Sequence, residues 1–397
     1  MTRPIRLLIR PAAMTHNLER VIDLLTDASR QCPGGGRSRP SVWAVIKADA
    51  YGHGIERAVK AFSRADGLAM LDYSEAVRAR SAGWQKPILM LEGLFEVQDV
   101  RTCLQWDLCP VIHESGQIGW IDEYASGFSA SKPLDVYLKL DTGMHRLGFT
   151  PPDYGGAFKQ LVALRGKHIV GRISHMTHFA CADEPSGIDA PMEIFQATVG
   201  DLAGDYCVAN SAAVLAHTRK ILDSSSLATS GQDARHWVRP GICLYGASPL
   251  ADRTAQQLGL LPSMTLQSRV LAVRSIKAGE GVGYSYLYRA ERDMRVAVVA
   301  CGYADGYPRH APSGTPVFVK GQLAKLAGRV SMDMLMVDIT DLPDVKVGDE
   351  VVLWGEGGPS IDEVARASQT IGYELMTAVT QRVPRIELES LIFDRAG

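Results

Sequence analysis

The chain has 397 residues, of which 46% are hydrophobic and 22% charged, and its formal net charge is −2. This length predicts a globular protein of about two to three domains. The balanced charge excludes the strongly basic surface that is typical of proteins that bind nucleic acids or anionic membranes. We therefore expect its partners to be small molecules and protein, with no nucleic acid and no membrane.

The seven cysteines are scattered along the chain and include no CxxC pair. Their odd number and irregular spacing argue against a disulfide framework and against a zinc or redox centre. The apolar residues 7–9 lie between Arg6 and Arg10, which leaves too short a run for an export signal. No apolar run reaches the length of a membrane span. The sequence thus predicts a cytoplasmic protein.

The first 40 residues predict a strand, a helix and a loop. We expect residues 5–9 to form a strand. Because they precede the first helix of the barrel predicted below, this strand could join the sheet of a second, C-terminal domain. Residues 28–40 are rich in Gly, Pro, Ser and Arg and predict a surface loop after that helix. A phosphate-binding loop is the alternative, but no GKS or GKT follows these glycines.

Between residues 41 and 246, apolar runs of strand length alternate with helix-like segments, which is typical of repeated βα units around a parallel sheet. Eight such runs predict a TIM-type (β/α)8 barrel. The runs begin near Val42, Leu68, Ile88, Pro110, Val136, Ile169, Tyr206 and Trp237. They end in polar residues that would gather at one mouth of the barrel: Lys47, Asp72, Glu92, His113, Asp141, His178, Asn210 and Arg239.

The most informative run is SVWAVIKADAYGHG, which places Lys47 at the carboxyl end of a strand buried on both faces. A lysine has a reference pKa of about 10.4, and burial or nearby positive charge lowers this pKa toward neutrality. Lys47 is therefore a candidate nucleophile. The alternative is a lysine that extends from a strand edge into solvent.

His175 and His178 have an HxxH spacing that could suggest a metal site. On a strand, residues three apart point to opposite faces, so we expect these two histidines to bind no common metal. We predict that the protein has no metal site.

After about residue 260 the pattern changes to alternating strands, which predicts a second, mostly β domain. The expected strands are residues 264–276, 295–301, 316–325, 334–339 and 350–353. We expect the barrel domain to span residues 12–255, and the β domain to span residues 256–397 with a strand from residues 1–11.

Several ordered blocks resemble those of alanine racemases, the barrel-type enzymes that use pyridoxal 5'-phosphate. The blocks are SVWAVIKADAYGHG, KLDTGMHRLGF, ANSAA, VRPGICLYG, GEGVGYSYLY, SMDMLM and IGYELMT. The resemblance implies interconversion of L-alanine and D-alanine, and a homodimer in which each active site is shared between two subunits. It also implies a role in supplying D-alanine for bacterial cell walls, or in alanine catabolism.

The resemblance also implies roles for single residues. Lys47 would bind the cofactor as a Schiff base and act as one base, and Tyr284 would enter from the partner subunit as the other. This agrees with the chemistry, because inverting a carbon centre requires a proton carrier on each face. Arg239 would face the pyridine nitrogen, with His178 between it and the tyrosine. The other implied cofactor-binding residues are Tyr51, Arg146, Asn210, Ser211, Gly241, Ile242 and Tyr373.

The implied substrate-binding residues are Arg146, Met332 and Asp333. Lys139 would be carbamylated and orient Arg146, because a guanidinium is held in plane by an anion; Asp141 is the alternative partner. Other functions stay open: a barrel-type pyridoxal phosphate decarboxylase, a racemase of broader specificity, a cofactor carrier, or a metal-dependent hydrolase that uses carbamylated Lys139. Arg239 and Tyr284 argue against the decarboxylase, and the second domain argues against the carrier.

Overall fold

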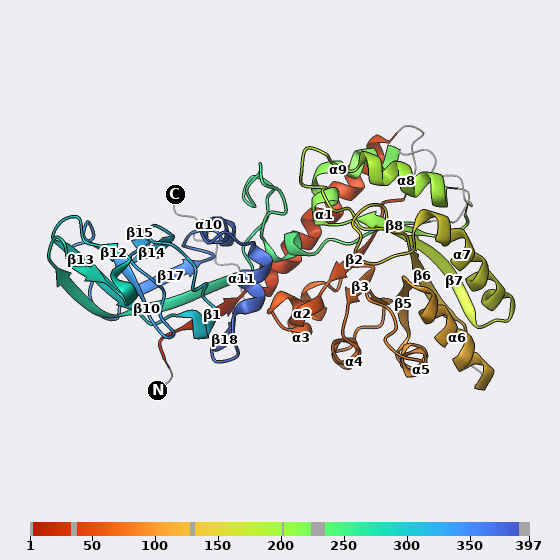
Figure 1. Cartoon of the computed structure of the whole chain (residues 1–397), viewed down its shortest axis with the longest axis horizontal. Coiled ribbons are helices and arrows are strands. Elements are labelled where there is room, and N and C mark those ends of the chain that lie inside the picture. The colour runs from red at the N-terminus through yellow and green to blue at the C-terminus, as the bar shows by residue number, and fades with distance from the viewer. Residues whose placement is uncertain (1–2, 33–37, 128–131, 201, 224–234, 389–397) are drawn as a thin grey trace.

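The computed structural model describes residues 3–32, 38–127, 132–200, 202–223 and 235–388. It has two parts that lie side by side, a barrel on the right of Figure 1 and a β-rich part on the left. The first and last strands, β1 (Arg6–Ile9) and β18 (Arg385–Glu387), both lie in the β-rich part. The first and last strands of the described chain therefore belong to the same sheet.

The barrel is a closed parallel sheet in the order in which its strands occur along the described chain. This confirms the predicted TIM-type barrel, and each strand begins within two residues of the predicted position. The strands are β2 (Ser41–Val45), β3 (Gly67–Met70), β4 (Ile88–Met90), β5 (Leu108–Ile112), β6 (Leu134–Lys139), β7 (Val170–Met176), β8 (Tyr206–Ala209) and β9 (His236–Val238).

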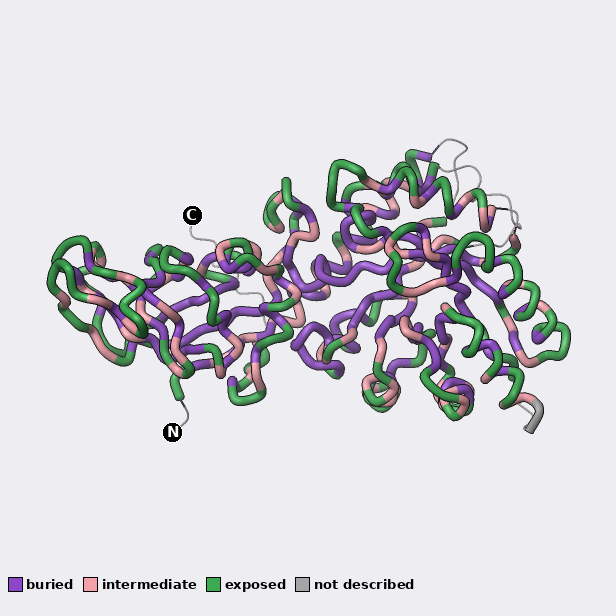
Figure 2. Tube along the Cα trace, viewed as in Figure 1, coloured by how far each residue is buried: buried purple, intermediate pink, exposed green. Residues whose placement is uncertain are grey.

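Helices surround this barrel and leave its strands buried (Figure 2). They are α1 (Pro11–Gln31), α3 (Ile55–Ala61), α4 (Tyr73–Ser81), α5 (Gln98–Trp106), α6 (Ser115–Gly127), α7 (Pro151–Gly166), α8 (Asp189–Val199) and α9 (Ser211–Asp223). Large aromatic side chains from several strands fill the interior. Trp43 stacks on Trp237 with ring centroids 4.2 Å apart and meets Tyr137 edge-on.

The predicted loop at residues 28–40 is wrong at its beginning. Helix α1 continues to Gln31, and Ser29 is buried on its core face and donates a hydrogen bond to the Leu25 carbonyl. The helical apolar spacing thus extends into a segment whose composition indicated a loop. Residues 33–37, with the glycines of this segment, lie outside the described residues.

The β-rich part is built on one long strand, β10 (Met264–Ile276), which pairs antiparallel with β1, β13 (Met294–Val299) and β17 (Glu350–Trp354). The sheet order is β13, β16, β15, β14, β17, β10, β1 and β18. Its other members are β14 (Pro316–Val319), β15 (Gln322–Leu326) and β16 (Leu335–Asp338). Helices α10 (Ile361–Ala367) and α11 (Gly372–Ala378) follow β17. The mostly β class of this part is confirmed.

One expected strand of this part has a different form. Residues 316–325 form a hairpin, β14 and β15, because Lys320 and Gly321 adopt positive φ values and turn the chain. Tyr284 and Tyr286 lie in a short 3-10 helix, η3 (Tyr284–Tyr286), between β11 (Gly281–Val282) and β12 (Tyr288–Arg289).

Buried polar contacts join the two parts near the barrel mouth. The ring of His53, after β2, contacts the hydroxyl of Ser263 at 2.8 Å, just before β10 begins. Burial lowers the pKa of His53 to about 4, so this histidine is neutral at pH 7. Among the described helices, none is both long and apolar enough to cross a membrane.

Candidate active site

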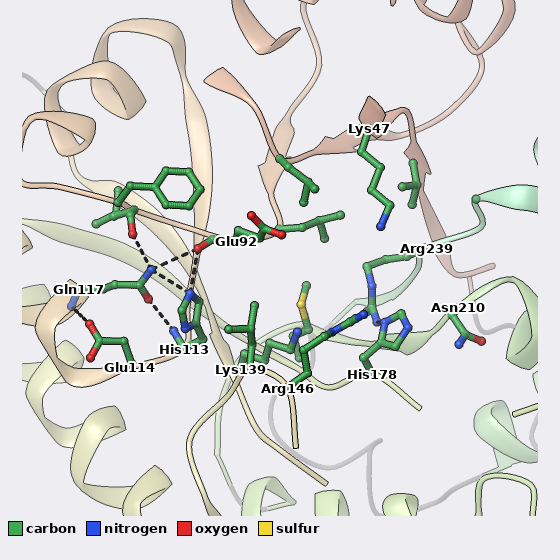
Figure 3. A pocket seen from close by; sticks show the side chains of 18 of the residues that line it. Lys47, Glu92, His113, Glu114, Gln117, Lys139, Arg146, His178, Asn210 and Arg239 are labelled. Carbon is green, nitrogen blue, oxygen red and sulfur yellow. Dashed lines mark hydrogen bonds between the residues drawn. The ribbon is translucent and has the colours of Figure 1, made fainter. Parts of the chain in front are cut away.

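A cavity of about 760 Å³ opens at the carboxyl ends of the barrel strands (Figure 3). This is the end at which barrels of this type carry their chemistry. Eleven of the residues singled out in the sequence line it: Lys47, Tyr51, Lys139, Arg146, His178, Asn210, Ser211, Arg239, Gly241, Ile242 and Tyr373. They come from the ends of strands far apart in the chain, which the closed barrel brings together.

Lys47 follows β2 and is half-buried at the mouth, with its amine pointing into the cavity (Figure 3). Burial lowers its pKa, and the nearby Arg146 guanidinium lowers it further, whereas Glu92 raises it. A lowered pKa increases the fraction of neutral amine at pH 7. The neutral amine is the form that acts as a nucleophile or a base.

Directly after Lys47 the chain makes a left-handed turn, α2 (Lys47–Tyr51), which returns Tyr51 to the cavity. The Tyr51 ring is buried against Tyr245 and Tyr373. Its hydroxyl lies against Gly241, where an added Cβ would come within 2.6 Å of the oxygen. Only glycine leaves this end of the cavity open.

The same end of the cavity carries small polar groups from two adjacent loops. Ser211 begins α9, and its hydroxyl accepts a hydrogen bond from the Gly241 amide at 2.7 Å. Asn210 caps the same helix, because its side-chain oxygen accepts from the Ala213 amide at 3.0 Å. The short helix η2 (Ile242–Tyr245) follows Gly241. Hydroxyl groups and main-chain amides at a helix start suit a phosphate.

Arg239 follows β9 and is buried among neutral partners. One terminal nitrogen donates to the carbonyl of Cys207 at 2.5 Å and to its thiol at 3.0 Å. The other donates to the Thr177 carbonyl at 2.6 Å and faces Nδ1 of His178 at 3.2 Å. No carboxylate of the described chain pairs with this guanidinium. Arg239 therefore brings an uncompensated positive charge into the cavity.

His178 follows β7 and responds to this charge. Burial lowers its pKa well below the usual value, and the Arg239 guanidinium lowers it further. The ring is therefore neutral at pH 7 and accepts at the nitrogen that faces Arg239.

Lys139 and Arg146 form a second positively charged region of the cavity (Figure 3). Burial lowers the pKa of Lys139 to about 8, with further lowering by Arg239 and Arg146. Within the described residues no carboxylate lies at ion-pair distance from either side chain. The expectation that Asp141 could hold Arg146 is wrong, because Asp141 accepts from the Gly143 and His145 amides and pairs with the His145 ring.

Two polar strand ends do not reach the cavity, although the sequence predicts them at the mouth. Asp72 caps α4, where its carboxylate accepts from the Ser74 amide at 2.6 Å. Asp141 is occupied by its own loop. A strand end places a residue at the barrel rim, but a short carboxylate there binds the nearest free main-chain amides first.

Three predicted site residues lie elsewhere in the same chain. Tyr284 is 69% exposed and Met332 is 53% exposed, and both lie in the β-rich part outside the cavity. Asp333 pairs with Arg382 at 2.6 Å and with Arg3 at 3.8 Å. Hence the cavity of one chain contains none of these three side chains.

The sequence reasoning missed one side of the cavity. His113 and Glu92 appeared only as strand ends, and Gln117 of α6 was not considered. The Gln117 amide contacts the His113 ring at 3.1 Å and donates to the carbonyls of Glu92 and Leu94 (Figure 3). Glu114, Phe95 and Trp120 complete this side. The sequence feature that could have identified these residues is their position shortly after the carboxyl ends of β4 and β5.

The two histidines of the HxxH motif separate, as their spacing predicts. His175 is buried beside the Tyr154 hydroxyl at 2.7 Å, whereas His178 lines the cavity. Among the residues that the structure describes, no group of three or more His, Cys, Asp or Glu side chains could hold a metal ion.

Comparison with known proteins gives consistent matches over the chain. The family model described as "Alanine racemase, N-terminal domain" matches residues 9–249, and "Alanine racemase, C-terminal domain" matches residues 263–387. The alanine racemase of Bordetella petrii is 50% identical over 385 residues, which cover 97% of this chain and 99% of that protein.

Solved structures also match over nearly the whole chain. The biosynthetic alanine racemase of Pseudomonas aeruginosa is 41% identical, with a TM-score of 0.86 over 98% of this chain and 100% of that one. The alanine racemase of Bacillus anthracis with bound L-Ala-P is 28% identical, with a TM-score of 0.75 over 98% of this chain and 96% of that one.

Proposed function

The chain belongs to the alanine racemase family, and on that premise we propose that it interconverts L-alanine and D-alanine with pyridoxal 5'-phosphate as its cofactor. One observation carries the proposal: Lys47, whose pKa is lowered, and Arg239, which has no carboxylate partner among the described residues, face the same cavity.

The cavity fits this cofactor in size and in chemistry. A volume of about 760 Å³ is within the range of small-molecule sites. The phosphate would bind at one end of the cavity, where hydroxyl groups and main-chain amides gather. These belong to Ser211, Gly241, Ile242, Tyr51 and Tyr373. Lys47 would bind the aldehyde carbon, and Arg239 would donate to the pyridine nitrogen. When bound, the cofactor stabilises the negative charge that develops when a proton leaves the α-carbon.

Lys47 and Tyr284 are the proposed proton carriers. Inversion requires one on each face of the α-carbon. The Lys47 amine moves the proton on one face, and the hydroxyl of Tyr284 of the partner subunit moves it on the other. The exposure of Tyr284 and its distance from its own cavity support this arrangement, since a second copy is then needed to complete the site.

Arg239 would keep the pyridine nitrogen unprotonated. A guanidinium is always protonated, so it donates a hydrogen bond to the nitrogen and supplies no proton. Its neutral partners leave this charge undiminished. The neutral His178 would join Arg239 to the phenol of Tyr284 of the partner subunit.

Arg146 would bind the substrate carboxylate, together with Met332 and Asp333 of the partner subunit. Lys139 would hold Arg146 in place as a carbamate. The Lys139 amine forms a bond to the carbon of carbon dioxide and loses one proton, and the resulting anion faces the guanidinium. The lowered pKa of Lys139 and the lack of a carboxylate beside Arg146, among the described residues, support this step.

The chain divides into two domains, and its exposed residues bear on how it assembles. We propose a barrel domain at residues 12–255 and a second domain at 256–397 with residues 1–11; the gap between β9 and β10 and the two family models support this boundary. Tyr284, Tyr286, Leu287 and Met332 are exposed, which supports a homodimer interface. The cytoplasmic location stays a prediction.

The test is incubation of the purified protein with L-alanine and pyridoxal 5'-phosphate in heavy water. We expect D-alanine to accumulate with deuterium at the α-carbon, and Lys47→Ala to abolish both signals. Release of carbon dioxide from alanine would instead indicate a decarboxylase. Deuterium incorporation without inversion would contradict the two-face arrangement.

A further inference from the structure

The chain directly after Lys47 has an unusual backbone. Ala48, Asp49, Ala50 and Tyr51 have φ values of 56°, 50°, 55° and 52°, and the Gly52 amide closes the turn on the Ala48 carbonyl at 3.0 Å. Residues with a Cβ disfavour the left-handed region and normally visit it singly. Four in succession persist only where the surroundings hold them.

The turn determines where two groups of the cavity lie. Lys47 precedes it and Tyr51 ends it, and both side chains line the cavity. If the turn relaxed toward negative φ values, the chain path between these residues would change. The Lys47 amine and the Tyr51 hydroxyl would then lose their relative placement.

Helix α4 holds this turn from outside. The Glu75 carboxylate accepts a hydrogen bond from the Asp49 amide at 2.5 Å. The Arg78 guanidinium pairs with the Asp49 carboxylate at 3.0 Å. That carboxylate also accepts from the Ile55 amide at 3.2 Å, which ties the turn to the start of α3. Neither Glu75 nor Arg78 is among the residues that line the cavity.

We propose that Glu75 and Arg78 are positioning residues that hold the left-handed turn and so fix Lys47 and Tyr51 for the cofactor. The inference rests on the proposed function for the identity of that cofactor. Glu75 acts on the main chain at Asp49, and Arg78 acts on its side chain.

The surroundings of Glu75 agree with a dedicated contact. One carboxylate oxygen is bound to the Asp49 amide, and the other is buried with no hydrogen-bond partner in the described structure. Burial raises the pKa of Glu75, and the charges of Asp72 and Asp49 raise it further. The hydrogen bond from the Asp49 amide lowers this pKa, so the contact with the turn offsets part of the cost of burying the carboxylate.

Other hydrogen bonds of the turn involve other groups: the Ala50 amide donates to the Ile46 carbonyl at 2.9 Å, and the Gly54 amide donates to the Asp49 carbonyl at 2.8 Å. The His53 ring contacts the carbonyls of Ala50 and Tyr51 at 3.0 Å, and Arg385 donates to the Gly52 carbonyl at 3.1 Å. None of these reaches the Asp49 amide. Removal of Glu75 therefore leaves that amide without its acceptor.

The test uses the full-length chain and compares Glu75→Ala, Glu75→Gln and Arg78→Ala. Glu56→Gln is the matched control, because Glu56 also pairs with Arg78, at 2.8 Å, and makes no contact with the turn. The first measurement is hydrogen exchange over residues 47–54 without cofactor. The second is the dissociation constant of pyridoxal 5'-phosphate from an absorbance titration. The melting temperature of each variant reports on folding.

We expect faster exchange over residues 47–54 in Glu75→Ala and at least about tenfold weaker cofactor binding, because the Asp49 amide loses the one acceptor that it has among the described residues. Arg78→Ala should show a smaller change in the same direction. Glu75→Gln keeps an acceptor and should bind within about threefold of the wild type, and Glu56→Gln should match the wild type.

Unchanged exchange in Glu75→Ala, or unchanged cofactor affinity in a folded variant, would overturn this inference. If Glu75→Ala does not fold, the same comparison is made between Arg78→Ala and Glu56→Gln. A wild-type protein that takes up no pyridoxal 5'-phosphate would refute the proposed function. If the wild type takes up pyridoxal 5'-phosphate and the variants have the same exchange and cofactor affinity as the wild type, only the positioning role is refuted.

Discussion

Arg239 enters the cavity with its charge intact, because it is held by carbonyl oxygens and the Cys207 thiol. A neutral side chain at this position would allow the pyridine nitrogen to be protonated. The ring would then withdraw more electron density, which favours proton delivery to the cofactor carbon. Arg239, which we propose to bind the cofactor, would thus also determine which reaction follows.

We predict that Arg239→Gln lowers the racemisation rate by about 10- to 100-fold, since a charged hydrogen bond is lost, and raises transamination. Accumulation of pyridoxamine 5'-phosphate during turnover with L-alanine measures the second effect. Arg172→Gln is a suitable control, because Arg172 pairs with Asp205 and does not line the cavity. A slower variant that forms no more pyridoxamine 5'-phosphate than the control would contradict this role.

Lys139 leads to a pH-dependent prediction. Its pKa is lowered to about 8, mainly by burial, and only the neutral amine reacts with carbon dioxide. At a fixed concentration of dissolved carbon dioxide, the carbamate therefore increases as the pH rises through 8. The stimulation of a carbon dioxide-depleted enzyme by added carbon dioxide should be larger at pH 8.5 than at pH 6.5.

The measured quantity is the ratio of rates with and without carbon dioxide at each pH, so other titrating groups cancel. Lys139→Gln should give a ratio of one throughout. Equal stimulation of the wild type and of this variant would mean that the effect arises elsewhere.

The loop after β9 shows how one missing side chain keeps a site open. Gly241 has no side chain, and an added Cβ would lie 2.6 Å from the Tyr51 hydroxyl. Overpacking of this kind costs about 1–3 kcal/mol.

Gly241→Ala should therefore weaken pyridoxal 5'-phosphate binding by about tenfold or more, and the melting temperature of the variant reports on its folding. An absorbance titration measures the dissociation constant of pyridoxal 5'-phosphate for this variant. Gly155→Ala in α7 is the control, because a Cβ there meets nothing within 4 Å. Similar affinities for both variants would show that the phosphate lies elsewhere.

The elements differ in how well the sequence predicts them. Buried parallel strands are found easily, since runs such as residues 41–46 are apolar on both faces. Strand ends then locate the cavity, as Lys47, His178 and Arg239 illustrate. The prediction that Asp72 and Asp141 line the cavity is wrong for a local reason. Each carboxylate accepts a hydrogen bond from a main-chain amide two residues later.

The left-handed turn could not be predicted from residue types. Ala48 and Ala50 have no intrinsic preference for positive φ, and the contacts that hold the turn come from α4, more than twenty residues later. The hairpin at residues 316–325, by contrast, has a local cause. Lys320 and Gly321 form a two-residue turn with positive φ values, which glycine favours.

At the scale of the whole molecule, the cavity of each barrel contains only one of its two proposed proton carriers. The cavity contains Lys47, whereas Tyr284 is exposed on the β-rich part of the same chain. If two chains exchange these residues reciprocally, a symmetric dimer holds two sites, each built from both chains. The arrangement can be tested with two variants that are each inactive alone.

We predict that Lys47→Ala and Tyr284→Phe complement each other when coexpressed. With random pairing, half of the dimers are hybrids, and each hybrid has one intact site, formed by Lys47 of one chain and Tyr284 of the other. About one quarter of the wild-type activity per site should therefore return. Mixing the purified variants under conditions that prevent subunit exchange should restore none. If Tyr284 acted within its own chain, no hybrid could contain an intact site, and coexpression would give no more activity than the separate variants.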